Sequence, residues 1–118
     1  MTRVVLVETL GRVIPGFAAH WARGDSLFVD TNGEFTSHGV FAECSGYVRE
    51  NYHALSDDSL KELAAFISSC LERVYGEDIE NAAATCFLEN LAGKPFHEEF
   101  SAYLRPAARS SYNRVVKG

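Results

Sequence analysis

The N-terminal segment lacks the long apolar run that a membrane span or a secretory signal requires. Only four consecutive apolar residues precede Glu8, whereas a spanning helix needs roughly 18 or more. Cysteine is also scarce. The chain has three cysteines, Cys44, Cys70 and Cys86, which lie far apart and include no CxxC pair. This spacing predicts neither a disulfide framework nor a zinc site, and a reducing compartment suits it. We therefore expect a soluble cytoplasmic protein with no membrane association.

Catalytic and cofactor signatures are missing as well. The four histidines occur without an HExxH motif or an i, i+4 pair, and the glycines lack the spacing of a phosphate-binding loop. Cys44 and Cys86 are predicted in mid-helix on apolar faces, where a thiol packs as a small hydrophobe. Neighbouring carboxylates such as Glu98 and Glu99 point about 100° apart in a helix, so they do not share one substrate. We predict no enzymatic activity, no cofactor and no metal.

Chain length and charge indicate how many domains to expect and which kind of partner fits. A chain of 118 residues, 47% of them hydrophobic, fits one helical domain that spans residues 1–118. Residues 1–92 carry 14 acidic and 6 basic side chains, net −8, whereas residues 93–118 have net charge +3. The acidic part disfavours nucleic acid as a ligand. A basic protein partner fits this charge, although a modest acidic excess also serves solubility alone.

Apolar residues at helical spacing predict two amphipathic helices in the middle of the chain. In residues 56–76 the apolar positions follow the i, i+3, i+4, i+7 rule up to Val74, with Ser56 or Ser59 as the N-cap and Gly76 as the stop. Residues 37–55 also show one apolar face and one charged face. The apolar face of this earlier helix consists of Phe41, Cys44, Val48, Tyr52 and Leu55.

A third helix is predicted from about Glu77 to Ala92, with Gly93 ending it. Its apolar residues, Cys86 among them, cover more than half of the circumference, which indicates packing on several sides. The polar residues Asn81, Thr85 and Glu89 form a stripe at i, i+4 and i+8. This stripe either faces water or forms a buried hydrogen-bonded seam, and we favour the seam. In a seam, Glu89 requires a donor such as Arg12, Arg73 or Arg105.

The segments before residue 37 contain two shorter elements. "RVVLVETLGRV" is compatible with a short helix or a strand, but Pro15 suits the first turn of a following helix, which favours two short helices. Residues 24–36 are predicted as either a short hairpin or an ordered loop pinned by Phe28 and Phe35. We prefer the loop.

The C-terminal part completes the predicted fold. Pro95 and Pro106 each mark a helix start, and the second of these helices is basic. Together the patterns predict an all-α, compact single-domain bundle of about five to six helices.

The central helices resemble a known family. The order "HGVFAECSGYV", "LSDDSLKELAAFISSCLE" and "IENAAATCFLENLAG", within residues 36–93, is similar to a family of small all-helical bacterial proteins of unknown function. Some members resemble immunity proteins encoded beside polymorphic or contact-dependent toxins. The resemblance implies a cytoplasmic binder that blocks a toxin domain without catalysis of its own, and it transfers no binding residue. The alternative is a small helical adaptor or regulatory module with another protein partner.

The densest stretch of one charge is the candidate partner surface. Between Asp25 and Glu62 eight acidic residues stand against two basic ones, net −6. Toxin nucleases tend to be basic because they bind phosphate backbones, so an acidic face is expected to attract such a domain. Phe28 or Phe35 is a candidate aromatic anchor, whereas on the plainer interpretation the carboxylates only solvate the surface. The predicted partner-binding residues are Asp25, Asp30 and Glu34 in the loop and Glu43 and Glu50 on the outer face of the next helix.

Overall fold

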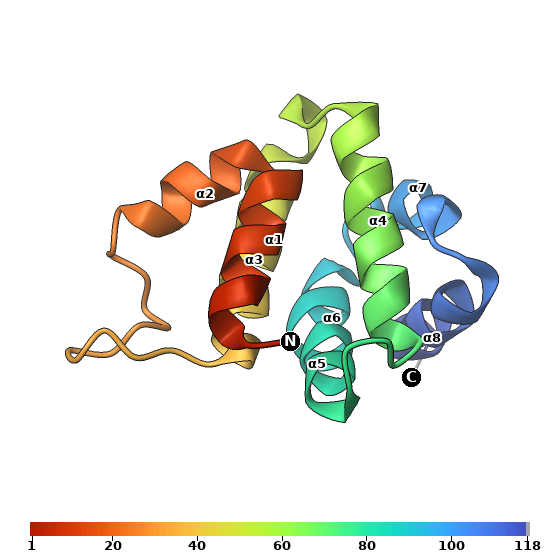
Figure 1. Ribbon diagram of the computed structural model, residues 1–118. Helices are drawn as coiled ribbons and strands as arrows, with labels where there is room; N and C mark the ends of the chain where they lie inside the picture. The colour runs from red at the N-terminus through yellow and green to blue at the C-terminus, as the bar shows by residue number, and fades with distance from the viewer. Residues whose placement is uncertain (118) are drawn as a thin grey trace.

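Helices are the only regular secondary structure within residues 1–117. The computed structural model describes the backbone of residues 1–117 and the side chains of residues 1–114. Helices make up 73% of the structure. Residues 1–117 contain no strand and seven helices, when the consecutive helical segments within residues 77–91 are counted as one central helix. They pack into a globule of 39 × 31 × 23 Å (Figure 1). The predicted all-α class is confirmed, with one helix more than the upper number expected.

Two short helices open the chain, as the position of Pro15 predicts. Thr2 caps α1 (Arg3–Val13), because its hydroxyl accepts a hydrogen bond from the backbone N–H of Val5 at 3.2 Å. Pro15 occupies the first turn of α2 (Pro15–Ala22). The two helices approach closely at Gly11, where a Cβ would lie only 2.9 Å from the Cβ of Ala18. Glycine at residue 11 therefore permits this tight packing.

The next helix is amphipathic, as its pattern predicts. Thr36 caps α3 (Ser37–Asn51), which continues into a short 3-10 turn, η1 (Tyr52–Ala54). The apolar face lies in the core and the opposite face is more exposed. The side chains of Phe41, Cys44, Val48 and Tyr52 are buried, and Leu55 is partly buried.

The following helix ends earlier than its sequence predicts. Ser56 rather than Ser59 caps α4 (Asp57–Leu71), because its hydroxyl accepts from the N–H of Ser59 at 3.1 Å. The chain then turns at Arg73, whose φ of 63° lies in the left-handed region and cannot continue an α-helix. Val74 is consequently 63% exposed instead of lying on the buried face, and Gly76 follows the turn rather than stopping the helix.

The central helix contains a widened turn that its sequence does not reveal. It runs through α5 (Glu77–Ala82), the π-helical segment η2 (Ala83–Leu88) and α6 (Glu89–Leu91). The segment η2 packs against α3, α4 and α8, so the predicted packing on several sides is confirmed. In the wide turn the N–H of Glu89 bonds to the carbonyl of Ala84, five residues back.

The polar stripe of this helix faces water. Asn81, Thr85 and Glu89 are all exposed, so the predicted buried seam is wrong. Two of its expected donors pair elsewhere, Arg73 with Glu80 at 2.9 Å and Arg105 with Glu72 at 2.8 Å.

Cys86 lies at the boundary between the buried and exposed faces of the central helix. Its side chain is half-buried and packs against the edge of the core, so its predicted core position is only partly correct. The neighbouring Asn90 donates a hydrogen bond to the Cys86 carbonyl at 2.8 Å.

Two helices close the bundle. The helix α7 (His97–Tyr103) begins two residues after Pro95, whereas α8 (Pro106–Lys117) begins at Pro106 as predicted. Phe96, Phe100 and Leu104 are buried at the expected four-residue spacing. Both helices pack against α4. Buried side chains from the N-terminal helices to Tyr112 form one contiguous hydrophobic core.

Candidate functional site

The segment between α2 and α3 projects from the helical body (Figure 1). We call residues 24–36 the acidic loop, since they include Asp25, Asp30 and Glu34 but no lysine or arginine. The segment contains turns and no strand, so the loop interpretation is confirmed and the hairpin is not formed.

Hydrogen bonds within the acidic loop order its outer end. The carboxylate oxygen Oδ1 of Asp30 accepts from the N–H groups of Asn32 at 2.8 Å and Glu34 at 3.0 Å. The backbone N–H of Asp30 bonds to the carbonyl of Glu34 at 2.9 Å, and Gly33 supplies the positive φ of 79° that the turn requires. One carboxylate oxygen of Asp30 therefore stabilises the conformation of the loop.

Aromatic contacts hold the base of the acidic loop against the helices. Phe28 lies directly over Gly39 of α3, where an added Cβ would be 2.9 Å from the Cβ of Phe28. The rings of Phe35 and Trp21 make a T-shaped contact with centroids 5.1 Å apart. The guanidinium of Arg3 lies 5.9 Å from the centroid of the same Phe35 ring. These contacts pin the loop at Phe28 and Phe35, as the sequence predicts.

The loop presents apolar surface to solvent. Leu27 is 96% exposed and Phe28 is 48% exposed, whereas Phe35 is half-buried. Phe28 is therefore the more accessible of the two predicted aromatic anchors. Leu27 is absent from the sequence-based candidates, because the apolar run from Ser26 to Val29 does not reveal which side chain points outward.

Two adjoining hollows lie beside the loop. The first has a volume of about 460 Å³ and the second about 520 Å³, and they share Arg3, Phe35 and Thr36. Leu27, Phe28, Asp30 and Glu34 also line the first hollow, and Ser37, His38 and Asp78 also line the second. The N-terminus of α1, the acidic loop and the starts of α3 and α5 thus meet in one concave surface.

The structure brings three of the five predicted acidic residues together. Asp25, Asp30 and Glu34 are exposed in the acidic loop, with Asp25 3.6 Å from Arg23. Glu50 is also exposed, but it lies near the other end of α3.

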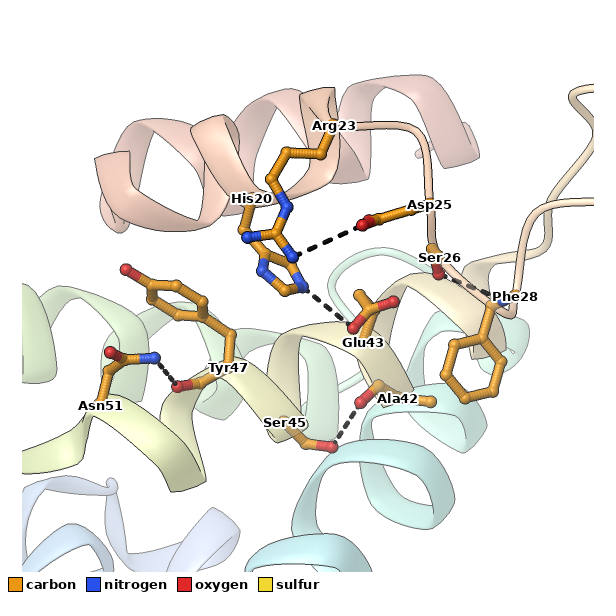
Figure 2. Close-up of polar contacts among 10 residues, drawn as sticks. All are labelled: His20, Arg23, Asp25, Ser26, Phe28, Ala42, Glu43, Ser45, Tyr47 and Asn51. Carbon is orange, nitrogen blue, oxygen red and sulfur yellow. Dashed lines mark hydrogen bonds and ion pairs between the residues drawn. The ribbon is translucent and has the colours of Figure 1, made fainter.

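Glu43 does not lie on an open outer face, and that prediction is wrong. Figure 2 shows His20 pointing from α2 toward Glu43, with 3.1 Å between His20 Nε2 and Glu43 Oε2. Their side chains are only 21% and 19% exposed. Helix α2 covers this part of α3, because the Tyr47 hydroxyl fits where Gly16 has no side chain. The acidic surface is therefore the loop, without Glu43.

The thiols of Cys44 and Cys70 show no sign of nucleophilic activation. Burial raises the pKa of Cys70 to about 12, and it raises the pKa of Cys44 even further, helped by the charge of Glu43. A reactive thiolate requires the opposite shift.

In the described part of the chain, no three His, Cys, Asp or Glu side chains gather closely enough to hold a metal ion. None of the helices within residues 1–117 has the length and apolar character to cross a bilayer. The acidic loop, with its exposed Leu27 and its two adjoining hollows, is the candidate site.

One family model matches the chain. It is described as "Domain of unknown function (DUF7674)" and matches residues 7–117. Curated proteins and solved structures yielded no match. The match agrees with the sequence resemblance in pointing to a family of unknown function.

Proposed function

We propose that this chain, which belongs to the DUF7674 family of domains of unknown function, binds a basic toxin domain and neutralises it as an immunity protein. It acts by stoichiometric binding and performs no reaction of its own. The acidic loop makes the principal contact, with Leu27 as its apolar anchor.

The observation that carries this proposal is the exposure of two adjacent apolar side chains, Leu27 and Phe28, on an ordered loop where both line the same hollow. An apolar side chain that is 96% exposed gains free energy when a partner covers it. The hydrogen bonds of Asp30 and the contacts of Phe35 already hold the loop in shape, so binding costs little ordering entropy. A protruding apolar pair suits a protein partner better than a small substrate, because small-molecule sites are concave and enclose most of their ligand.

The charge of the loop supports a basic partner. The three carboxylates of the loop outnumber the nearby Arg3 and Arg23, which leaves a negative surface around the anchor. Such a surface speeds encounter with a basic domain and covers the groove with which that domain binds phosphate. The resemblance to immunity proteins supports a toxin as this partner. Three unpaired cysteines support a cytoplasmic location, where thiols stay reduced.

Co-purification with the tagged protein from its native strain, followed by expression of the captured domain alone, tests the proposal. We expect a single basic partner in a one-to-one complex, and we expect that partner to arrest growth unless this chain is co-expressed. A captured partner with no toxicity would favour the alternative, a helical adaptor or regulatory module.

A loop variant tests the surface. The double change Leu27→Ser with Glu34→Lys is expected to weaken binding by at least about tenfold, and the association rate should lose much of its salt dependence. The control is Glu62→Lys, which makes the same single charge reversal at an exposed position of α4 away from the loop. Asp30 and Glu43 stay unchanged because they hold local structure. An equal loss of affinity in both variants would mean that the partner does not bind at the acidic loop.

A further inference from the structure

The two hollows beside the acidic loop carry an excess of negative charge. Asp30 and Glu34 line the first, Asp78 lines the second, and Arg3 lines both. The concave surface can therefore accept another positive charge without becoming positive overall. The carboxylates come from two distant parts of the chain, so the folded structure alone creates this site.

The chain already places one guanidinium in this concave surface. Arg3 lies over the ring of Phe35, and the same ring makes a T-shaped contact with Trp21. Among the side chains of residues 1–114 no ion pair or hydrogen bond holds the Arg3 side chain. Arg3 thus occupies the aromatic face through a weak contact that another cation can replace.

We propose that the two hollows form an arginine-binding site that Arg3 occupies in the free protein and that an arginine of the partner takes over on binding. The incoming guanidinium lies over Phe35, with Asp30 and Glu34 as its counter-charges. An apolar neighbour of that arginine covers Leu27. This inference rests on the proposed function for its biological meaning, but the site itself can be tested without the partner.

Chemistry favours arginine over lysine here. A guanidinium is planar, stacks on an aromatic ring and offers several N–H donors in one plane, whereas an ammonium is compact and more strongly hydrated. Phe35 supplies the ring, and the two carboxylates of the first hollow supply the acceptors. Leu27, on the rim of the same hollow, supplies the apolar contact for a neighbouring side chain.

A dipeptide titration tests the site. Acetyl-Leu-Arg-amide is added to the full chain, with any tag kept away from the N-terminus, while the fluorescence of Trp21 is followed. Trp21 is the single tryptophan and contacts Phe35, so it reports on the aromatic face. We expect saturable binding that weakens at least about threefold with Lys in place of Arg and is lost with uncharged citrulline.

Removing the resident arginine gives the sharpest comparison. Arg3→Ala frees the ring and removes a like charge, so the dipeptide should bind at least about threefold more tightly. Arg12→Ala makes the same charge change on α1 outside the two hollows and should alter binding less than about twofold. Asp30→Asn with Glu34→Gln should weaken binding, because both carboxylates lose their charge while the amide oxygen introduced at position 30 can still accept the hydrogen bonds of the turn.

Several outcomes would overturn the arginine site. These are the absence of saturable binding, equal affinity for the Arg and citrulline peptides, or weaker binding by Arg3→Ala. If the purified partner still requires Leu27 in that case, the proposed function stands and only this inference falls. If the dipeptide behaves as expected and no toxin partner is found, the site stands and the proposed function falls.

Discussion

At the scale of single residues, the most unusual groups are three buried polar atoms. The hydroxyls of Tyr52 and Tyr112 and Nδ1 of His97 have no hydrogen-bond partner in the described structure. Tyr112 lies with its ring centroid 4.8 Å from that of His97, so two of the three atoms belong to one cluster. Burial raises the pKa of Tyr112 to about 12, and burial together with the charge of Glu99 raises that of Tyr52.

Tyr112→Phe should leave the free energy of unfolding unchanged or raise it by about 1 kcal/mol, because it removes a buried hydroxyl without a partner. Urea unfolding at pH 7 measures the difference. A loss of more than about 1 kcal/mol would mean that the hydroxyl makes a bond that stabilises the fold.

Tyr112→Phe is also expected to change how the free energy of unfolding depends on pH in the alkaline range. Below the ordinary tyrosine pKa of 10, Tyr112 is neutral in both the folded and the unfolded chain, so stability is fully present. As pH rises from 10 toward 12, the unfolded chain releases the proton first, and stability falls. Tyr112→Phe should flatten this fall relative to the wild type.

At the scale of elements, the central helix differs most from an ordinary α-helix. In its wide turn the carbonyl of Cys86 accepts a hydrogen bond from the side chain of Asn90, which also donates to the hydroxyl of Ser45 on α3 at 3.0 Å. Asn90 therefore supports the wide turn and joins it to a neighbouring helix. The exposed Glu89, one residue before it, has no comparable role within the described structure.

Asn90→Ala should lower the free energy of unfolding by about 1–3 kcal/mol, because two part-buried acceptors lose a hydrogen bond. Glu89→Ala is the matched control on the same turn and should change stability by less than about 0.5 kcal/mol. Thermal unfolding of both variants gives the comparison. If Glu89→Ala were the more destabilising, the polar stripe would contribute to stability after all.

At the scale of the whole molecule, one core joins the N-terminal and C-terminal helices. Phe87 of η2 lies between Phe41 of α3 and Phe100 of α7, with ring centroids 6.2 and 6.1 Å away. The half-buried Trp21 packs against this core from the N-terminal side. The acidic loop lies outside the core, so changes at its tip need not alter the helical body.

Phe87→Ala should lower the free energy of unfolding by about 3–5 kcal/mol, since it leaves a cavity between α3 and α7. Trp21 fluorescence and far-ultraviolet circular dichroism should still give coincident transitions, which is the behaviour of a single cooperative domain. Two separated transitions would instead indicate that the N-terminal and C-terminal helices unfold independently.

The amino-acid sequence by itself determined most of the helices. Apolar spacing is a local property of consecutive turns, and Pro15 and Pro106 mark helix starts through their fixed φ and missing N–H. The loop at residues 24–36 was predictable for the same reason, because its turn residues act on their own backbone.

Only the tertiary structure decided which polar side chains are exposed and therefore accessible to a partner. Glu43 has the charge and spacing of an outer-face residue, yet α2 covers it and His20 binds it. The stripe at Asn81 looked like part of a packed helix, yet it faces water. Arg3 and Asp78 join the concave surface beside the acidic loop although they come from opposite halves of the chain. Which side chains are exposed, and which distant residues come into contact, depends on how the helices pack. The hydrophobic effect that drives this packing is non-directional, so the local sequence pattern does not specify which helices will cover a given face.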